Sequence, residues 1–158
     1  MAETEAGGRA PARRGDDPGL LRRLLLGLML LGMLGLLAEL VLLEHYEDVW
    51  QWVPLAALAL GIVLAGAVWM RPGRATLRAF RAMSAVYVAA GALGLYLHLD
   101  GNLEFEREGD RNARGLPLLW EALRGATPVL APGALVQLGL LGLALAYRHP
   151  ALRHDGAE

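Results

Sequence analysis

Residues 24–43 read LLLGLMLLGMLGLLAELVLL, and this run decides the fold because Glu39 is its one charged residue. The hydrocarbon core of a bilayer is about 30 Å thick, and a helix rising about 1.5 Å per residue crosses it in about 20 residues. The run has that length, and it lacks the apolar–polar alternation of a membrane β-strand. The polar residues 44–46 follow it in place of the small residues of a signal-peptide cleavage site. We therefore predict an uncleaved transmembrane helix.

Three more apolar runs lie further along the chain, at residues 53–70, 82–99 and 129–147. None of them contains Asp, Glu or Arg, so each can cross hydrocarbon as a helix. The sequence predicts an all-α integral membrane protein, in which residues 20–153 form an antiparallel four-helix transmembrane bundle. Residues 1–19 are rich in Gly, Ala, Pro and charge, and we expect them to be a disordered tail. Residues 154–158 form a second short tail.

The arginines indicate which side of the membrane each connection faces. All fifteen basic residues are Arg, and cytoplasmic segments near membrane spans are enriched in such residues. Arginines precede the first run, separate the second from the third and follow the fourth; they are Arg9, Arg13, Arg14, Arg22, Arg23, Arg71, Arg74, Arg78, Arg81, Arg148 and Arg153. Connections 44–51 and 100–128 carry more acids than arginines. We therefore predict that both tails are cytoplasmic.

The composition also bears on source and chemistry. Arg, Ala, Leu and Gly are used heavily in place of Lys, Ile and Asn, which favours a bacterial chain and hence the bacterial inner membrane. The chain has no Lys, no Cys and a single Ser, Ser84. A Schiff base, a phosphate-binding loop and thiolate chemistry are therefore excluded. The arginines lie between apolar runs and form no basic face, so no nucleic-acid partner is expected.

The connection before the fourth run has a pattern of its own. Residues 103–106 alternate between apolar and acidic side chains, which is typical of a short strand or a turn. Residues 116–124 follow helical spacing and predict a short amphipathic helix on the outer surface, with one apolar stripe formed by Leu116, Leu119, Trp120 and Leu123. Pro128 and Pro132 fit the first turns of the fourth helix, where a missing N–H donor is tolerated.

Small residues predict where the helices pack, because in lipid close backbone approach supplies much of the contact between helices. Ala57, Gly61 and Ala65 recur every fourth residue on the second run. Similar small-residue faces occur on the other runs, at Gly32, Gly35, Ala90, Gly94, Gly139 and Gly142. We expect each of these faces to meet another helix.

Glu39 is the most informative polar residue, because a carboxyl group within hydrocarbon costs a few kcal/mol and usually faces other helices or water. Tyr96 and Gln137 lie at a comparable depth on the third and fourth runs. We predict an intramembrane polar cluster of these three residues, with Glu39 on the same inward face as Gly32 and Gly35. The cluster would serve either a proton, an ion or a polar ligand, or the order of the bundle.

A second candidate site lies at the predicted outer surface. It contains two imidazoles and three carboxylates, from Glu44, His45, Asp48, His98 and Asp100. Such groups can hold a divalent metal such as Zn²⁺, and His45 with His98 could ligate a haem. No His-x-x-x-His or Glu-x-x-His spacing brings them onto one helix face, and an outer loop is polar in any case. We therefore expect no tightly bound cofactor, and weak cation binding at most.

Three functional classes fit these features. The first is a non-enzymatic accessory or structural subunit of a membrane complex, bound to the lipid bilayer and to a membrane-protein partner or to further copies of itself. The second is a transporter or channel component that uses Glu39. The third is a membrane redox or metal protein that uses His45 and His98. Short loops, few polar residues and the lack of inverted repeats favour the first.

Overall fold

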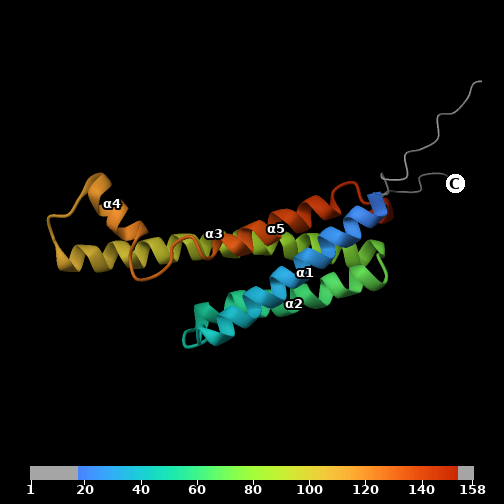
Figure 1. The fold of residues 1–158 in the computed structure, drawn as a ribbon, viewed down its shortest axis with the longest axis horizontal. Coiled ribbons are helices and arrows are strands. Elements are labelled where there is room, and N and C mark those ends of the chain that lie inside the picture. Colours follow the sequence, from blue (N-terminus) through green and yellow to red (C-terminus); the bar gives the residue numbers. More distant parts are fainter. Residues whose placement is uncertain (1–17, 153–158) are drawn as a thin grey trace, which may run out of the picture.

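A computed structural model describes residues 18–152 of the 158-residue chain. This part is helical throughout and contains no strand, which confirms the all-α prediction for the described residues (Figure 1). Its elements are α1 (Pro18–Leu42), η1 (Val49–Gln51), α2 (Trp52–Met70), α3 (Arg74–Gly109), α4 (Gly115–Leu123), α5 (Gly133–Ala146) and η2 (Pro150–Leu152). The predicted tails lie outside the described residues, except that Pro18 and Gly19 already belong to α1.

Three of these helical segments are long and apolar enough to cross a membrane: α1, the continuous η1–α2 segment, and α3. Helix α5 is apolar as well, but it has 14 residues. Residues 129–132, which follow Pro128, form turns in which a backbone N–H donates to the carbonyl three residues earlier. Gly133 N–H, for example, donates to the Leu130 carbonyl at 2.9 Å. The fourth helix therefore begins later than predicted, and Pro132 precedes it as the N-cap residue.

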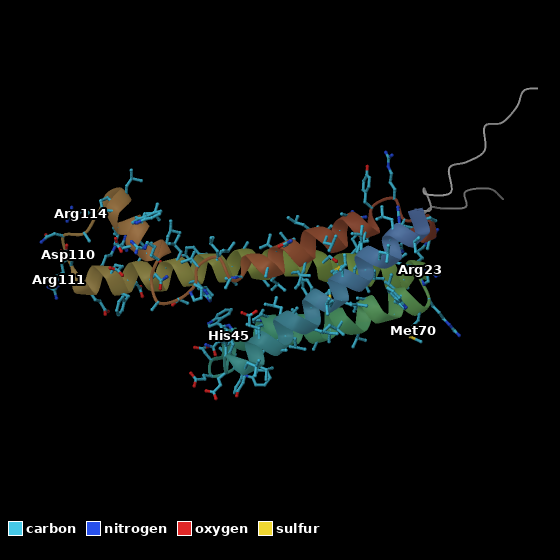
Figure 2. The ribbon with its side chains drawn as sticks, in the orientation of Figure 1. Arg23, His45, Met70, Asp110, Arg111 and Arg114 are labelled. Carbon is cyan, nitrogen blue, oxygen red and sulfur yellow. The ribbon has the colours of Figure 1, made fainter. Side chains whose placement is uncertain are left out.

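The helices α1, α2, α3 and α5 pack against one another in neighbouring pairs (Figure 1). Helix α1 packs against α2 and α5, and α3 packs against α2 and α5. The start of α1, the α2–α3 connection and the end of α5 meet at one end, which we call the arginine end. The α1–α2 connection lies at the other, which we call the His45 end (Figure 2).

Helix α1 contacts its neighbours through large side chains. Leu26, Met29 and Met33 are buried, at the i, i+3 and i+7 spacing of one helix face. A Cβ atom added at Gly32 would lie 3.2 Å from Leu138 Cδ2 of α5, and one added at Gly35 would meet nothing within 4 Å. The prediction of a close helix contact is therefore wrong for Gly35, whereas Gly32 lies at the margin of the contact with α5.

The α2–α3 contact confirms the packing face predicted on the second run. Ala57, Gly61 and Ala65 are all buried. The Tyr87 ring of α3 lies over Gly61, and its hydroxyl donates to the Ala57 carbonyl at 3.2 Å. Glycine is required at position 61, because an added Cβ atom would lie 2.6 Å from Tyr87 Cζ.

The α3–α5 contact is built from small residues on both helices, also as predicted. A Cβ atom at Gly94 would lie 2.9 Å from Pro132 Cβ, and one at Gly139 would lie 2.6 Å from the Ser84 carbonyl oxygen. Ser84 is buried, and its hydroxyl donates to the Phe80 carbonyl at 2.8 Å. These two helices approach closely because few side chains separate their backbones.

Helix α3 is longer than the predicted span. It has 36 residues and therefore a length of about 54 Å, well beyond the thickness of a hydrocarbon core. Residues 103–106, predicted as a strand or turn, belong to this helix. The prediction failed because a helix needs only one face in contact with the rest of the chain, and here the buried Asn102 and the half-buried Leu103 supply that face.

Helix α4 occupies residues 115–123, close to the predicted range, and packs against the extended part of α3 (Figure 1). Its buried residues are Leu118 and Ala122. The predicted apolar stripe points elsewhere, since Leu116 is 81% and Trp120 is 60% exposed. Helix α4 thus has one apolar face on α3 and a second one uncovered.

Candidate functional site

The predicted polar cluster of Glu39, Tyr96 and Gln137 is not assembled. All three side chains are exposed, and no hydrogen bond joins them within residues 18–152. The prediction matched the residues by depth along the helices, but the rotation of α1 is set by Leu26, Met29 and Met33. Glu39 therefore faces outward, and a role inside the bundle is not supported for it in the single chain.

The second predicted site is partly assembled, beginning at the end of α1. His45 N–H donates to the Leu40 carbonyl at 2.9 Å, and Glu44 N–H donates to the Val41 carbonyl at 3.1 Å. Glu44 has a φ of 53°, so this is a Schellman ending with Glu in the position that glycine usually takes. This helix ending fixes the backbone of His45, the residue directly after Glu44. The side chain of Glu44 itself is exposed.

The carboxylate of Asp48 has a structural task in the same connection. Asp48 Oδ1 accepts a hydrogen bond from Trp50 N–H at 2.9 Å and so caps η1. Gln51 Oε1 accepts in return from Asp48 N–H at 3.1 Å and from Glu47 N–H at 2.7 Å. This reciprocal capping box starts the helix that leads into α2. Asp48 is thereby oriented toward its own helix end.

His98 lies inside α3, at the level where the chain turns toward α5. Its Nδ1 is 3.0 Å from the Pro128 carbonyl oxygen. A carbonyl oxygen only accepts, so Nδ1 carries the proton in this contact and the neutral ring has its lone pair on Nε2. The contact joins α3 to the segment before α5 and fixes the orientation of the His98 ring.

The two histidines are brought together, although 53 residues separate them in the sequence. The centroids of the His45 and His98 rings are 6.5 Å apart in an edge-to-face arrangement, with an interplanar angle of 64°. Burial lowers the pKa of His45, and the positive charge that His98 can carry lowers it further. The neutral form of His45 is therefore favoured at this contact.

The other three predicted ligands do not complete a metal site with the histidines. Within residues 18–152, no group of three or more His, Cys, Asp or Glu side chains is arranged to hold a metal ion. Asp100 is two residues after His98 in a continuous helix, so the two side chains leave α3 in different directions. The sequence predicted that the helix ends near Leu99, which would have left Asp100 free to turn. Metal binding itself stays a prediction.

Asn102 is a residue that sequence reasoning missed. It is 3% exposed, and its Nδ2 donates to the carbonyls of Ala122 and Thr127 at 2.9 and 2.8 Å. Its Oδ1 accepts from Thr127 N–H at 3.2 Å. All the polar groups of this buried amide are therefore used, and they hold the end of α4 on α3. A lone Asn in a charged segment gives no signal of such a task.

Arg22 plays a comparable part at the arginine end. Its Nη1 donates to the Leu145 carbonyl at 3.5 Å and its Nη2 to the Tyr147 carbonyl at 3.4 Å. These carbonyls belong to the end of α5, where the helix dipole favours a positive charge. The first and last helices are joined there. Arg22 also contributes, after burial, to the lowered pKa of His149.

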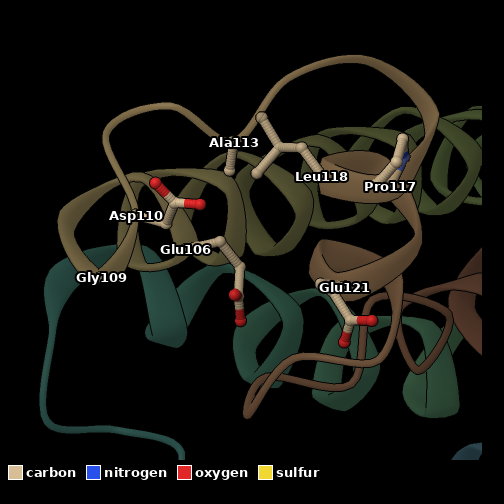
Figure 3. Close-up of a pocket in the computed structure, with 7 residues that line it drawn as sticks. All are labelled: Glu106, Gly109, Asp110, Ala113, Pro117, Leu118 and Glu121. Carbon is tan, nitrogen blue, oxygen red and sulfur yellow. The ribbon is translucent and has the colours of Figure 1, made fainter.

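A cleft of about 330 Å³ separates the end of α3 from α4 (Figure 3). Its lining residues are Glu106, Gly109, Asp110, Ala113, Pro117, Leu118 and Glu121. Three of them are carboxylates, but Asp110 already accepts from Asn112 N–H at 2.8 Å in the α3–α4 turn. The carboxylates do not form a metal-binding group, and the cleft is open to the surface.

Comparison with known proteins adds no family to these observations. The chain matches no protein-family model, no curated protein and no solved structure. Its function therefore has to be argued from its own residues.

Proposed function

We propose that this chain is a four-span membrane protein that serves as a non-enzymatic accessory subunit of a membrane complex. Both ends of the chain lie in the cytoplasm, and the membrane is the inner membrane of a bacterium. The extended part of α3 together with α4, residues 100–123, stands outside the membrane and binds a partner protein. The observation that carries the proposal is the uncovered apolar face of α4.

The lengths of the helices support four spans. The helices α1, η1–α2 and α3 each exceed the required length. Helix α5 covers about 21 Å with 14 residues, and the turns of residues 129–132 add about 8 Å at the rise of a 3₁₀-helix. The sum of about 29 Å matches a hydrocarbon core of about 30 Å. Leucines such as Leu28 and Leu31 are exposed on α1, where lipid would cover them.

The distribution of charge supports the orientation. Arg23 and Met70 lie at one end of α1 and α2, and His45 lies at the opposite end (Figure 2). The arginines of the α2–α3 connection and of the α5 end are on the same side as Arg23. The α1–α2 connection carries only acids among its charged residues. Retention of positive charge in the cytoplasm therefore favours the arginine end as the inner one.

The α4 face supports a protein partner in place of lipid. Helix α3 leaves the bundle near His98, and its remaining 11 residues extend about 16 Å further. Helix α4 packs on this extension, beyond the ends of α1 and α2 (Figure 1). Its exposed large apolar side chains are Leu116, Leu119, Trp120 and Leu123, and Phe105 is exposed on α3. An apolar surface that neither lipid nor the chain covers is typical of a protein interface, and Trp is enriched at such interfaces.

Co-purification of wild-type and variant chains tests this proposal. Wild type, a Leu116→Ser/Trp120→Ser variant and a matched Met70→Ser/Trp69→Ser control at the arginine end are purified from native membranes in mild detergent. We expect a defined partner at a fixed ratio with wild type and control, and its loss from the α4 variant. A chain that migrates alone, or that keeps the same companions in all three samples, would contradict the proposal.

The transporter alternative has less support. A proton- or ion-handling carboxylate needs a position inside the bundle or along a water-filled path. Glu39 is exposed on α1, about one turn from its end, and within residues 18–152 no hydrogen bond joins it to Tyr96 or Gln137. An acid at that position can extend toward the headgroups, which reduces the cost of its burial.

A further inference from the structure

We propose that His45 and His98 together bind one divalent transition-metal ion of the Zn²⁺ class through two imidazole nitrogens, with water completing the coordination. This inference does not depend on the accessory role, since the two rings belong to one chain. The ion would join the end of α1 to α3 and, through Pro128, to the segment that begins α5.

The hydrogen bond of His98 is the first observation. Histidine ligands of metals commonly donate their second ring N–H to a carbonyl or carboxylate, which fixes the tautomer and the ring orientation. His98 Nδ1 makes this bond to the Pro128 carbonyl at 3.0 Å. The Nε2 lone pair of a neutral His98 is therefore free to bind an ion. Pro128 is held by its own turn, in which Ala131 N–H donates to the same carbonyl at 3.2 Å.

The placement of His45 is the second observation. Its ring is half-buried, and no hydrogen bond to either of its nitrogens occurs within the described residues. With metal–nitrogen bonds of about 2.0 Å, two imidazoles on one ion have centroids about 5 to 6.4 Å apart, from a tetrahedral to a linear arrangement. The observed 6.5 Å lies just above this range. Binding of one ion therefore requires the His45 side chain to move toward His98, and His45 lies in a connection outside any regular helix.

The chemistry of the surroundings selects the class of ion. Two neutral imidazoles favour Zn²⁺, Cu²⁺ or Ni²⁺ over Ca²⁺ and Mg²⁺, which prefer oxygen ligands. The connection that carries His45 also contains Glu44, Glu47 and Asp48 and no basic residue, so its field attracts cations. Two protein ligands make a weaker site than three or four, and exchange with the solution should be fast.

Calorimetric titration with ZnCl₂ alone tests the proposal on the full chain in detergent, after chelator treatment and without a histidine tag. His98→Asn keeps an N–H donor for the Pro128 carbonyl and removes the Nε2 ligand. His45→Phe keeps a ring of similar size and removes both nitrogens. The chain has four histidines, so a His149→Gln/His154→Gln variant removes the other two and serves as the matched control.

We expect one Zn²⁺ per chain, an affinity that falls at least about tenfold in His98→Asn and in His45→Phe, and no change in the control. Zinc should also raise the melting temperature of wild type but not of the two site variants, because binding to the folded state stabilises it. Equal zinc binding by wild type and His45→Phe/His98→Asn would overturn the proposal. So would an absence of binding at millimolar zinc, or a haem absorption band in the protein as purified from native membranes.

Discussion

At the scale of single residues, the contact between Gly61 and Tyr87 determines how closely α2 and α3 approach. The hydroxyl of Tyr87 occupies the space that a side chain at position 61 would fill, and it donates to the carbonyl of Ala57 at 3.2 Å. A buried tyrosine hydroxyl needs such a partner, because an unpaired buried donor costs free energy. The small residue and the polar contact therefore depend on each other.

Gly61→Ala should lower the free energy of unfolding by about 1–3 kcal/mol, because the added Cβ atom displaces Tyr87 from its carbonyl partner. Gly66→Ala is the matched control on the same helix, since a Cβ atom there meets nothing within 4 Å. Thermal unfolding in detergent measures both. Equal melting temperatures for the two variants would show that α2 and α3 do not approach at Gly61.

His45 makes the stability of its end of the molecule dependent on pH. Its pKa is lower in the folded chain than the ordinary value of 6.5, because of burial and of the nearby His98. Below about pH 6.5 the unfolded chain therefore binds a proton that the folded chain resists, so stability falls as the pH falls. Above that pH both states are neutral at this residue, and the contribution disappears.

The melting temperature should accordingly drop more between pH 7.5 and 5.5 in wild type than in His45→Phe. The pKa of His149 is lowered as well, first by burial and then by Arg22, so His149→Gln should remove a separate part of the same dependence. Superimposable pH profiles of wild type and His45→Phe would contradict this account of the His45–His98 contact.

At the scale of helices, α4 is attached to α3 through two buried apolar residues and one buried amide side chain. Leu118 and Ala122 give α4 a small buried surface, and Asn102 adds three hydrogen bonds to the segment that ends it. A helix of nine residues is not stable alone in water, so its order depends on these contacts.

Asn102→Ala should release α4 from α3, because it removes the side-chain hydrogen bonds to the Ala122 carbonyl and to the Thr127 carbonyl and N–H, at a cost of about 1–3 kcal/mol. Hydrogen exchange followed by mass spectrometry should show faster exchange over residues 115–127 and no change in α1 and α2. Asn112→Ala is the control, since the Asn112 side chain is exposed in the α3–α4 turn. Unchanged protection of α4 in the Asn102 variant would show that apolar packing alone is sufficient.

The helices and some of their contacts could be predicted from the sequence because length and spacing carry that information. The apolar runs identify the positions of α1, α2, α3 and α5, and the spacing of Ala57, Gly61 and Ala65 identifies a packing face. Both are local properties of one helix. The small residues of α3 and α5 predicted a packing face in the same way, because only helices that approach closely require small residues at their contact.

The other contacts depend on which neighbour each side chain packs against, and a local sequence pattern does not contain that information. Glu39 was assigned to the interior because it shares a stripe with Gly32 and Gly35, but larger side chains on the adjacent face of α1 decide the rotation of the helix. Asn102 acquires its partners only because α3 continues to Gly109 and α4 folds back on it. The pairing of His45 with His98 could be guessed from their common end, whereas Asp48 turned out to cap a helix.

At the scale of the whole molecule, the account requires that α1, α2, α3 and α5 each cross the membrane. The critical helix is α5, which reaches the needed length only together with the turns that precede it. If α5 did not cross, the connection that contains α4 and the end of the chain would lie on the same side. The proposed position of α4 outside the cell membrane would then fail as well.

Accessibility of single cysteines tests this requirement most directly, because the natural chain contains no Cys and each new thiol is unique. Tyr46→Cys, Gly73→Cys, Asn112→Cys and Pro150→Cys place one thiol in each exposed connection or end. In spheroplasts treated with a membrane-impermeant maleimide, positions 46 and 112 should react at once, and positions 73 and 150 only after lysis. Labelling of positions 112 and 150 from the same side would contradict the four-span account.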